Sequence, residues 1–257
     1  MNNDRQRPQI KKHVIITDKE WSVRHLYDGE GWIESYWRSR NDPHRLFLAE
    51  KICKFSSNSV LEIGCACGPN LYQIARRCPK SEIRGIDINP LAIRKGNEWF
   101  MHEGISNVKL EVGRVQELEH FADKSFDVVF TDAVLIYISP DEIKQVVKEM
   151  LRIGRVVVMN EWHTFNKSLA LFLSIYNYLK QKSKEWLFPR EPSRTLNYSF
   201  KPRSISLDIF VGHWVRDYRA LLEEFVSKEK IYVTKLPKEL WNDRGWRRWG
   251  AIIEVVR

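Results

Sequence analysis

The stretch VLEIGCACGPN, residues 60–70, joins an apolar run to an amphipathic segment through a turn of very small residues. Gly64, Ala66 and Gly68 alternate along this turn, and such residues let a ligand lie directly on the main chain. The carboxylate of Glu62 suits a cationic ligand, and the turn departs from the G-x-G-x-x-G pattern that receives a pyrophosphate. Asp87 ends the next apolar run, where its oxygens can accept both hydroxyls of a ribose.

Alternating apolar and amphipathic segments must position these residues. Strands are predicted at 59–64, 82–88, 108–113, from 125 onward, at 155–162, 230–236 and 251–257. Helices are predicted at 45–55, 70–78, 90–104, 139–153 and 215–225. Strands that alternate with helices favour a parallel sheet with right-handed crossovers. Because ligands of such sheets bind at the carboxyl ends of the strands, the glycine turn and Asp87 lie at the right edge for a site.

Two segments interrupt this pattern. The first forty-odd residues mix polar side chains with aromatic ones such as Trp21, Trp32 and Tyr36, which predicts a partly helical arm that packs on another surface and is not a free tail. After Trp162 comes an amphipathic segment and then a connection rich in Pro, Arg and Ser. We therefore predict a single domain over 1–257, with an N-terminal arm or lid at 1–45, a core at 46–163 and 213–257, and an inserted helical cap at 164–212.

Composition narrows the class of protein. The chain has 257 residues, of which 43% are hydrophobic and 29% charged, enough to build a sizeable core. Its net charge of +9 permits anionic partners, but the charge is scattered, so it identifies none. No apolar stretch is long enough to span a bilayer and the polar N-terminus lacks a signal-peptide segment, so a cytoplasmic location is expected.

Four cysteines could suggest zinc. Cys53, Cys65, Cys67 and Cys78 fit no zinc signature well, because only the second and third are close together. We expect small buried thiols and no metal.

Three ordered motifs together carry a resemblance. VLEIGCACGPN, IRGIDINPLAI (83–93) and FDVVFTDAVLIYI (126–138) resemble the class I S-adenosylmethionine-dependent methyltransferases over roughly 45–163, and more loosely over the last forty residues. The resemblance implies an α/β, Rossmann-like, seven-stranded and mostly parallel sheet with helices on both faces. It also implies a methyltransferase that uses S-adenosyl-L-methionine, releases S-adenosyl-L-homocysteine and needs no metal.

The resemblance implies a set of cofactor-binding residues. These are Glu62, Gly64, Cys65, Ala66, Gly68 and Asn70 around the methionine and ribose, Asp87 on the ribose hydroxyls, Ile88, Asn89, Arg114 and Val115 beside the adenine, Thr131, Asp132 and Ala133 towards the methionine end, and Trp37 and Arg40 of the arm on the cofactor carboxylate. Singly, the glycines fit a tight turn, Asp87 a helix N-cap and Trp37 the core. The chain has Gly-Arg-Val at 113–115 where the family often has Gly-Asp-Ala, so the acid that contacts the adenine amino group is missing.

Methyl transfer to a hydroxyl would also need a base. Tyr137, Glu161 and His163 follow the fourth and fifth strands and are the candidates. The alternatives are a structural histidine at His163 and a Glu161 that braces the cap. Asp217 is interpreted as a helix N-cap. If the last two strands form a hairpin, the Trp- and Arg-rich loop 237–250 would help to enclose the acceptor.

The acceptor is left open by the sequence. We favour a small-molecule or sugar-type acceptor methylated at oxygen or nitrogen, because TDAV (131–134) differs from the motif used on exocyclic amines of nucleic acids. RNA methylation is the alternative that the basic charge suggests. A third hypothesis is contact with a membrane surface through 168–188, with a lipid-linked acceptor, against which a cap helix packed on the sheet must be weighed. A cofactor-binding regulator without catalysis and the oligomeric state also remain open.

Overall fold

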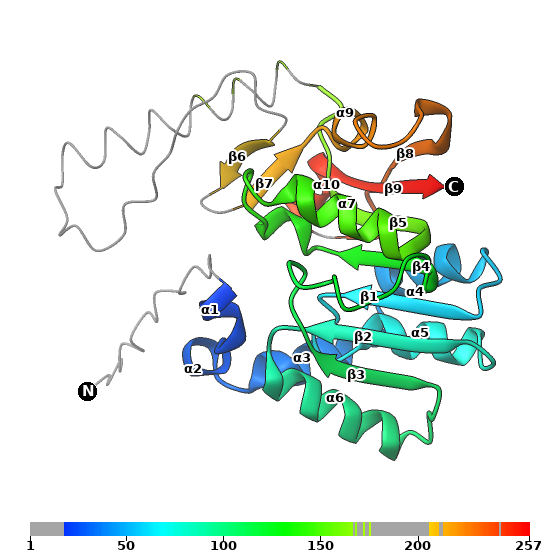
Figure 1. Cartoon of the computed structure of the whole chain (residues 1–257). Helices are drawn as coiled ribbons and strands as arrows, with labels where there is room; N and C mark the ends of the chain where they lie inside the picture. The colour runs from blue at the N-terminus through cyan, green and yellow to red at the C-terminus, as the bar shows by residue number, and fades with distance from the viewer. Residues whose placement is uncertain are drawn as a thin grey trace, which may run out of the picture.

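The computed structural model describes residues 18–166, 168, 172, 175, 206–210, 213–241 and 243–257 (Figure 1). Its main feature is a seven-stranded sheet with the order β3-β2-β1-β4-β5-β9-β8. The strands are β1 (Ser59–Ile63), β2 (Glu82–Asp87), β3 (Val108–Val112), β4 (Phe126–Asp132), β5 (Gly154–Trp162), β8 (Ile231–Lys235) and β9 (Gly250–Val256). The first five pair in parallel, and β9 runs antiparallel to both β5 and β8. The predicted mostly parallel, Rossmann-like sheet is confirmed.

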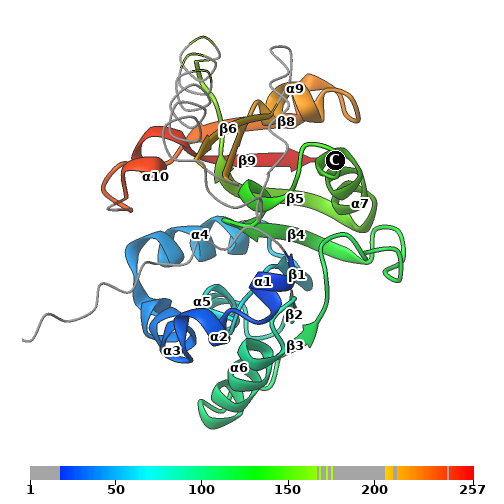
Figure 2. The same ribbon diagram turned by 90° about the vertical axis from the view of Figure 1, so that its left-hand side faces the viewer.

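Helices cover both faces of this sheet (Figure 2). One face carries α3 (Gly31–Arg38), α4 (Pro43–Cys53), α5 (Pro69–Arg77), α6 (Pro90–His102) and α10 (Arg244–Trp249). The other carries α7 (Ile143–Ile153) and α9 (Tyr218–Leu222). In α7 the buried positions recur with the helical period, from Ile143 through Val146 and Val147 to Met150, so one stripe of the helix packs on the sheet.

The arm predicted before residue 45 is helical in its described part. It contains α1 (Asp18–Ser22), α2 (His25–Asp28), α3 and the short 3₁₀ helix η1 (Ser39–Asn41). Figures 1 and 2 place α1 at the carboxyl ends of the parallel strands, in front of β1 and β2. Trp32, Ile33 and Trp37 of α3 are buried in the core, so the arm packs on the domain as predicted.

The region before α9 differs from its prediction. A helix was predicted over 215–225, but Val215 and Arg216 belong to β7 (His213–Arg216), which pairs with β6 (Ser206–Phe210). The helix begins at Tyr218, after Asp217, whose side chain accepts a hydrogen bond from the N–H of Ala220 and caps it as predicted. Pairing with a second strand overrides the helical spacing here, an effect that local periodicity does not report.

Two short 3₁₀ helices complete the described elements, η2 (Leu135–Tyr137) after β4 and η3 (Lys228–Lys230) before β8. Most of the predicted cap, including nearly all of the segment 168–188 weighed as a membrane contact, lies outside the described residues. Within the described part, none of the helices is both long and apolar enough to cross a membrane.

Candidate functional site

A pocket opens at the carboxyl ends of β1, β2 and β4. Thirteen of the predicted site residues line it: Glu62, Gly64, Cys65, Ala66, Asn70, Asp87, Ile88, Asn89, Arg114, Val115, Asp132, Ala133 and Tyr137. Six others lie outside its lining: Trp37, Arg40, Gly68, Thr131, Glu161 and His163. The structure therefore gathers predicted residues that are up to 75 positions apart in the sequence, since those that line the pocket run from Glu62 to Tyr137.

The small residues of the turn are required by the chain's own packing. Gly64 and Gly68 have φ of +75° and +81°, in the left-handed region that favours glycine. A Cβ at Gly64 would lie 2.2 Å from a methyl of Val134, and one at Gly68 would lie 2.6 Å from the ring of Phe100. Thus the turn is shaped first by the fold, and the bare main chain that results faces the pocket at Gly64.

Asp87 ties the ends of β1 and β2 together. Its Oδ2 accepts the N–H of Ala66 at 2.8 Å, and its Oδ1 accepts the N–H of Asn89 at 2.8 Å. Burial raises the pKa of this carboxyl, against the two backbone bonds that lower it. The N-cap of α6 is Asn89, whose Oδ1 accepts from the N–H of Ala92, so Asp87 is left to face the pocket.

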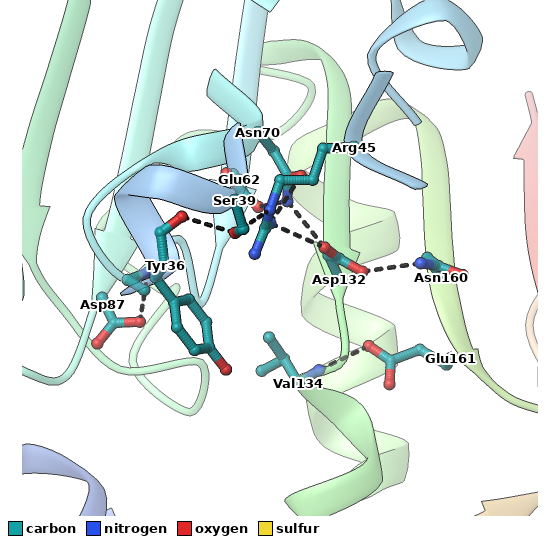
Figure 3. Close-up of polar contacts among 11 residues, drawn as sticks. Tyr36, Ser39, Arg45, Glu62, Asn70, Asp87, Asp132, Val134, Asn160 and Glu161 are labelled. Atoms are coloured by element: carbon teal, nitrogen blue, oxygen red, sulfur yellow. Dashed lines mark hydrogen bonds and ion pairs between the residues drawn. The ribbon is translucent and has the colours of Figure 1, made fainter. Parts of the chain in front are cut away.

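A buried polar network occupies the other end of the pocket (Figure 3). Asn70 Nδ2 donates to Glu62 Oε1 at 2.6 Å and to Asp132 Oδ2 at 2.9 Å, and Asn70 Oδ1 accepts from Arg45 Nη1 at 3.0 Å. Asp132 Oδ1 accepts from Asn160 Nδ2 at 2.8 Å. The five side chains come from α4, β1, α5, β4 and β5, so the network fixes the relative positions of these elements.

Two atoms of the network have unused bonding capacity. Among the described residues, Glu62 Oε2 is buried and has no hydrogen-bond partner. Arg45 donates through Nε to Ser39 and through Nη1 to Asn70, and no described residue bonds its Nη2. Burial raises the pKa of Glu62 to about 8. A buried acid without a full set of partners gains most from a cationic ligand, and a guanidinium nitrogen from an anionic one.

The arm forms the wall opposite the strands. The guanidinium of Arg24 lies over the rings of Trp21, Trp32 and Tyr36, at 4.9, 4.5 and 5.7 Å from their centroids. The ring of Trp21 packs edge-on against Tyr137 at 4.9 Å, and its carbonyl accepts from Asn89 Nδ2 at 2.9 Å. Aromatic rings and one cation therefore face the strand ends across the pocket.

The arm also supplies an acid beside the third strand. Asp18 Oδ2 accepts from Arg114 Nη2 at 2.6 Å and from Gln116 Nε2 at 3.1 Å, and all three line the pocket. The sequence predicted that an acid would be missing in this part of the site, because Arg114 stands where the family often has Asp. A carboxylate is nevertheless present at this end of the pocket, contributed by a residue 96 positions away.

Residues 60–156 match the family model described as a methyltransferase domain. This part of the chain is a methyltransferase domain.

Individual relatives match the methyltransferase domain in part. An uncharacterised protein of Rickettsia prowazekii (strain Madrid E) is 30% identical over 95 residues, which are 36% of this chain and 38% of that protein. A trans-aconitate 2-methyltransferase of Deinococcus radiodurans is 28% identical over 102 residues, 39% of this chain and 36% of that protein. The chain thus spans little more than a third of the length of either relative.

The fold is shared more widely than the sequence. The crystal structure of a putative S-adenosyl-L-methionine-dependent methyltransferase from Methanococcus maripaludis superimposes with a TM-score of 0.56 at 15% identity. The superposition covers 90% of this chain and 92% of that one. The similarity supports the Rossmann-like architecture over the methyltransferase domain and the segments around it.

The arm residues predicted to meet the cofactor carboxylate lie outside the pocket lining, Trp37 in the core and Arg40 half-buried. Trp37 stacks on Trp99 with centroids 5.1 Å apart, and Arg40 Nη2 lies 3.7 Å from Glu103. Thr131 is wholly buried under the end of β4. The surroundings of Trp37 therefore agree with its interpretation as a core residue. Arg45, which lies outside 60–156, lines the pocket, as Arg24 and Arg114 also do.

Of the three candidate bases, only Tyr137 lines the pocket, and burial raises its pKa well above the usual range. His163 is buried, and its Nδ1 accepts a hydrogen bond from the N–H of Tyr218 at 3.2 Å. Glu161 is fully buried and accepts the N–H groups of Val134, Leu135 and Ile136 at 3.0–3.1 Å. Glu161 braces the turn after β4, whereas the alternative that the sequence left open was a brace for the cap.

Cys65 and Cys67 are buried, and Cys53 and Cys78 are half-buried with sulfur atoms 2.6 Å apart. All four are free thiols. Among the described residues, His, Cys, Asp and Glu form no cluster of three that could hold a metal ion.

Sequence reasoning missed several residues that line the pocket. Asp18, Arg24 and Arg45 are absent from the predicted site, and Tyr36 was assigned only to the packing of the arm. Trp241 lies in the loop between β8 and β9, which pair as the predicted hairpin, and it lines the pocket as expected for that loop. Its ring stacks between His44 and Trp246, at 4.1 Å from each. The available signal was the density of aromatic and basic residues in the arm.

Proposed function

We propose that this protein transfers the methyl group of S-adenosylmethionine to a small-molecule acceptor. The observation that carries the proposal is that two acids line the pocket at the ends of neighbouring strands. Glu62 has an unpartnered oxygen, and Asp87 lies across the bare turn from it. When bound, S-adenosylmethionine supplies a methyl group on a positively charged sulfur, which a lone pair of the acceptor takes by in-line displacement.

The residues of the pocket suit the parts of this molecule. Glu62 Oε2 would accept the ammonium of the methionine part, and Arg45 Nη2 would donate to its carboxylate. Asp87 would accept the two ribose hydroxyls with the lone pairs that its backbone bonds leave. Ile88 and Val115 would pack on the adenine, close to the polar pair of Arg114 and Asp18.

The surroundings of the acceptor favour a carboxylic acid. Tyr137 keeps its proton because its pKa is raised, and the two other candidate bases lie outside the lining. A carboxylate has already lost its proton at neutral pH, so its oxygen can attack the methyl carbon without a base. The new O–CH₃ bond forms as the S–CH₃ bond breaks, and the charges of carboxylate and sulfonium cancel.

Arg24 is the residue that would hold such an acceptor. Its guanidinium faces the pocket between aromatic rings, where an anion is attracted with little screening by water. The similarity to a relative named trans-aconitate 2-methyltransferase, whose name describes an acidic acceptor, agrees with this choice. Oxygen or nitrogen acceptors on sugars and RNA are the alternatives.

Two measurements test the proposal. Calorimetry should detect S-adenosylhomocysteine binding to the whole chain, and failure to bind either the donor or this product would refute the methyltransferase function. A screen with methyl-labelled donor should then label small carboxylic acids, and alkali should release the label as methanol because methyl esters hydrolyse. Label that stays on sugar nucleotides or bulk RNA after alkali would keep the methyltransferase and overturn the carboxylate acceptor.

Arg24→Gln tests the role of the guanidinium. We expect kcat/KM for the labelled acid to fall about tenfold to a hundredfold, as for a lost charge-assisted hydrogen bond, with S-adenosylhomocysteine affinity nearly unchanged. Arg24 Nε donates to Asp28 at 2.7 Å. Arg84→Gln is the matched control, because Arg84 pairs with an acid in the same way, Glu82, but lies outside the pocket. Equal effects of the two substitutions would remove Arg24 from the acceptor site.

A further inference from the structure

The turn that follows β4 is held from both sides by fully buried charges. Glu161, on β5, accepts the N–H of Val134 and of Leu135 through Oε1, each at 3.0 Å, and that of Ile136 through Oε2 at 3.1 Å. Arg216, on β7, donates through its two terminal nitrogens to the carbonyls of Leu135 and Ile138. Both side chains are 0% exposed.

These contacts act on main-chain atoms, which points to a positioning role. A buried carboxylate and a buried guanidinium are costly to remove from water. Burial disfavours the charged form of both groups, since it raises the pKa of Glu161 to about 7 and lowers that of Arg216. The chain bears this cost at one turn, and that turn lines the pocket.

The turn itself has an unusual main chain. Ala133, its first residue, has φ of +61°, a left-handed conformation that a residue with a side chain rarely adopts. Its N–H donates to the carbonyl of Asn160 at 3.0 Å, and the next three N–H groups all reach Glu161. Strain of this kind persists only where the surroundings hold the residue in place.

The turn carries four residues of the pocket wall, Ala133, Val134, Tyr137 and Ile138. Val134 also occupies the space next to Gly64, where a Cβ would lie 2.2 Å from its methyl. A shift of the turn would therefore move the wall and press on the glycine turn at the same time. Figure 3 shows the Glu161 carboxylate directed at the main chain of Val134, on the side away from Asp87.

We infer that Glu161 and Arg216 are positioning residues that hold the 133–138 turn in the shape needed to bind the methyl donor. The pair acts through the main chain and touches neither donor nor acceptor. This inference rests on the proposed function for its ligand. It also gives the strand β7, which follows the region predicted as a cap, a direct connection to the pocket wall.

The test uses Glu161→Gln in the full chain. Gln keeps the size of the side chain but turns an NH₂ group towards backbone N–H donors, so at least one of the three bonds is lost. We expect faster hydrogen exchange at the amides of 134–136 and S-adenosylhomocysteine affinity reduced about tenfold or more. Ile83→Ala is the control, a fully buried change at the far end of β2 that lowers stability without touching the turn.

A second variant tests the inference if Glu161→Gln alone fails to fold. Glu161→Gln with Arg216→Met removes both charges, which protein cores generally tolerate better than one unpaired charge. The inference predicts the same fast exchange at 134–138 and the same weak binding in this folded double variant. Unchanged exchange and unchanged affinity in either folded variant would overturn it. A parent protein that fails to bind S-adenosylhomocysteine would refute the proposed function instead, and exchange at 134–136 would still report on Glu161.

Discussion

Two walls enclose the pocket, and they are held in different ways. The strand wall, formed by 62–70, 87–89 and 132–134, is fixed by buried carboxylates that accept main-chain or amide N–H groups at 2.6–2.9 Å. The arm wall, formed by 18–36, is fixed by ring contacts, by one buried amide and by an ion pair whose partners are 41% and 37% exposed. The first wall belongs to the core. The second joins the core only through α3, where Trp32 and Ile33 are buried, and its residues 18–28 are laid over it.

The difference implies separate roles for the two walls. Bonds to buried charges are worth about 1.5–3 kcal/mol each, whereas exposed ion pairs contribute about 0–1 kcal/mol. Elements held by weak, exposed contacts open most easily. We therefore expect the strand wall to determine donor affinity and the arm wall to determine how fast ligands enter and leave.

The largest effect should come from Asp87→Ala in the strand wall. The change removes the proposed ribose partner and also the two bonds that hold Ala66 and Asn89. S-adenosylhomocysteine affinity should fall at least about a hundredfold, from the loss of two charge-assisted bonds. Calorimetry on folded protein measures this directly.

Asp127 provides the matched control for Asp87. Its Oδ2 also accepts two backbone N–H groups, from Asn58 and Ser59, but at the opposite end of the sheet. Asp127→Ala should lower Tm and leave affinity unchanged. If both substitutions weakened binding equally, Asp87 would act on the ligand only through the general stability of the fold.

The next effect concerns pH and Glu62. Burial raises the pKa of this carboxyl to about 8, so below that pH the empty pocket holds it protonated. Binding of an ammonium requires the charged form, so affinity for S-adenosylhomocysteine should rise by up to about tenfold per pH unit from pH 6 towards 8 and then level off. Titration calorimetry in buffers of different ionisation enthalpy should also record release of a proton.

Glu62→Gln should bind about tenfold more weakly at pH 8 and lose this pH dependence. Glu254→Gln is the control, an acid of the same sheet that pairs with Lys51 outside the pocket. A parent affinity that is flat between pH 6 and 8 would mean that Glu62 is already ionised or does not meet the ammonium.

The strand wall could be predicted because its determinants are short-ranged. The apolar runs that end at Ile63 and Asp87 fix which residues reach the carboxyl edge, and parallel pairing then brings those ends together. The left-handed main chain at Gly64 and Gly68 favours glycine, and the alternating small residues at 64, 66 and 68 display this demand in the sequence. For these residues, the period of the strands and the backbone demands of the turn were sufficient information.

The arm wall could not be predicted in the same way. Asp18 meets Arg114 across 96 positions, and Asn89 meets Trp21 across 68. Nothing in the local spacing selects Arg45 over Arg40 as an arginine that lines the pocket. The same limit explains Arg216, which was predicted in a helix and lies in a strand because of its pairing with β6.

Trp21→Ala should produce a smaller effect, and chiefly a kinetic one. The substitution removes the ring contact with Tyr137 but keeps the carbonyl that accepts from Asn89. We expect S-adenosylhomocysteine to dissociate about threefold to tenfold faster, the range for one aromatic pair. Stopped-flow fluorescence measures the rate, and Trp99→Ala, a half-buried tryptophan outside the pocket lining, is the control. Unchanged dissociation in both variants would show that the arm does not cover the bound ligand.

The smallest effect should come from Asp18→Asn, which breaks the exposed ion pair between the arm and Arg114. Dissociation should quicken by about twofold to threefold at low salt, and the difference should vanish at 1 M salt because screening weakens exposed charges. Glu117→Gln is a close control, since Glu117 lies 3.4 Å from Arg114 Nε but belongs to no part of the arm. If the two walls have separate roles, Asp18→Asn should change the dissociation rate, and its effect on that rate should exceed the effect of Glu117→Gln. A loss of affinity as large as that expected for Asp87→Ala, or an effect that persists at high salt, would mean that the arm holds the ligand by direct contact. The two walls would then share one role.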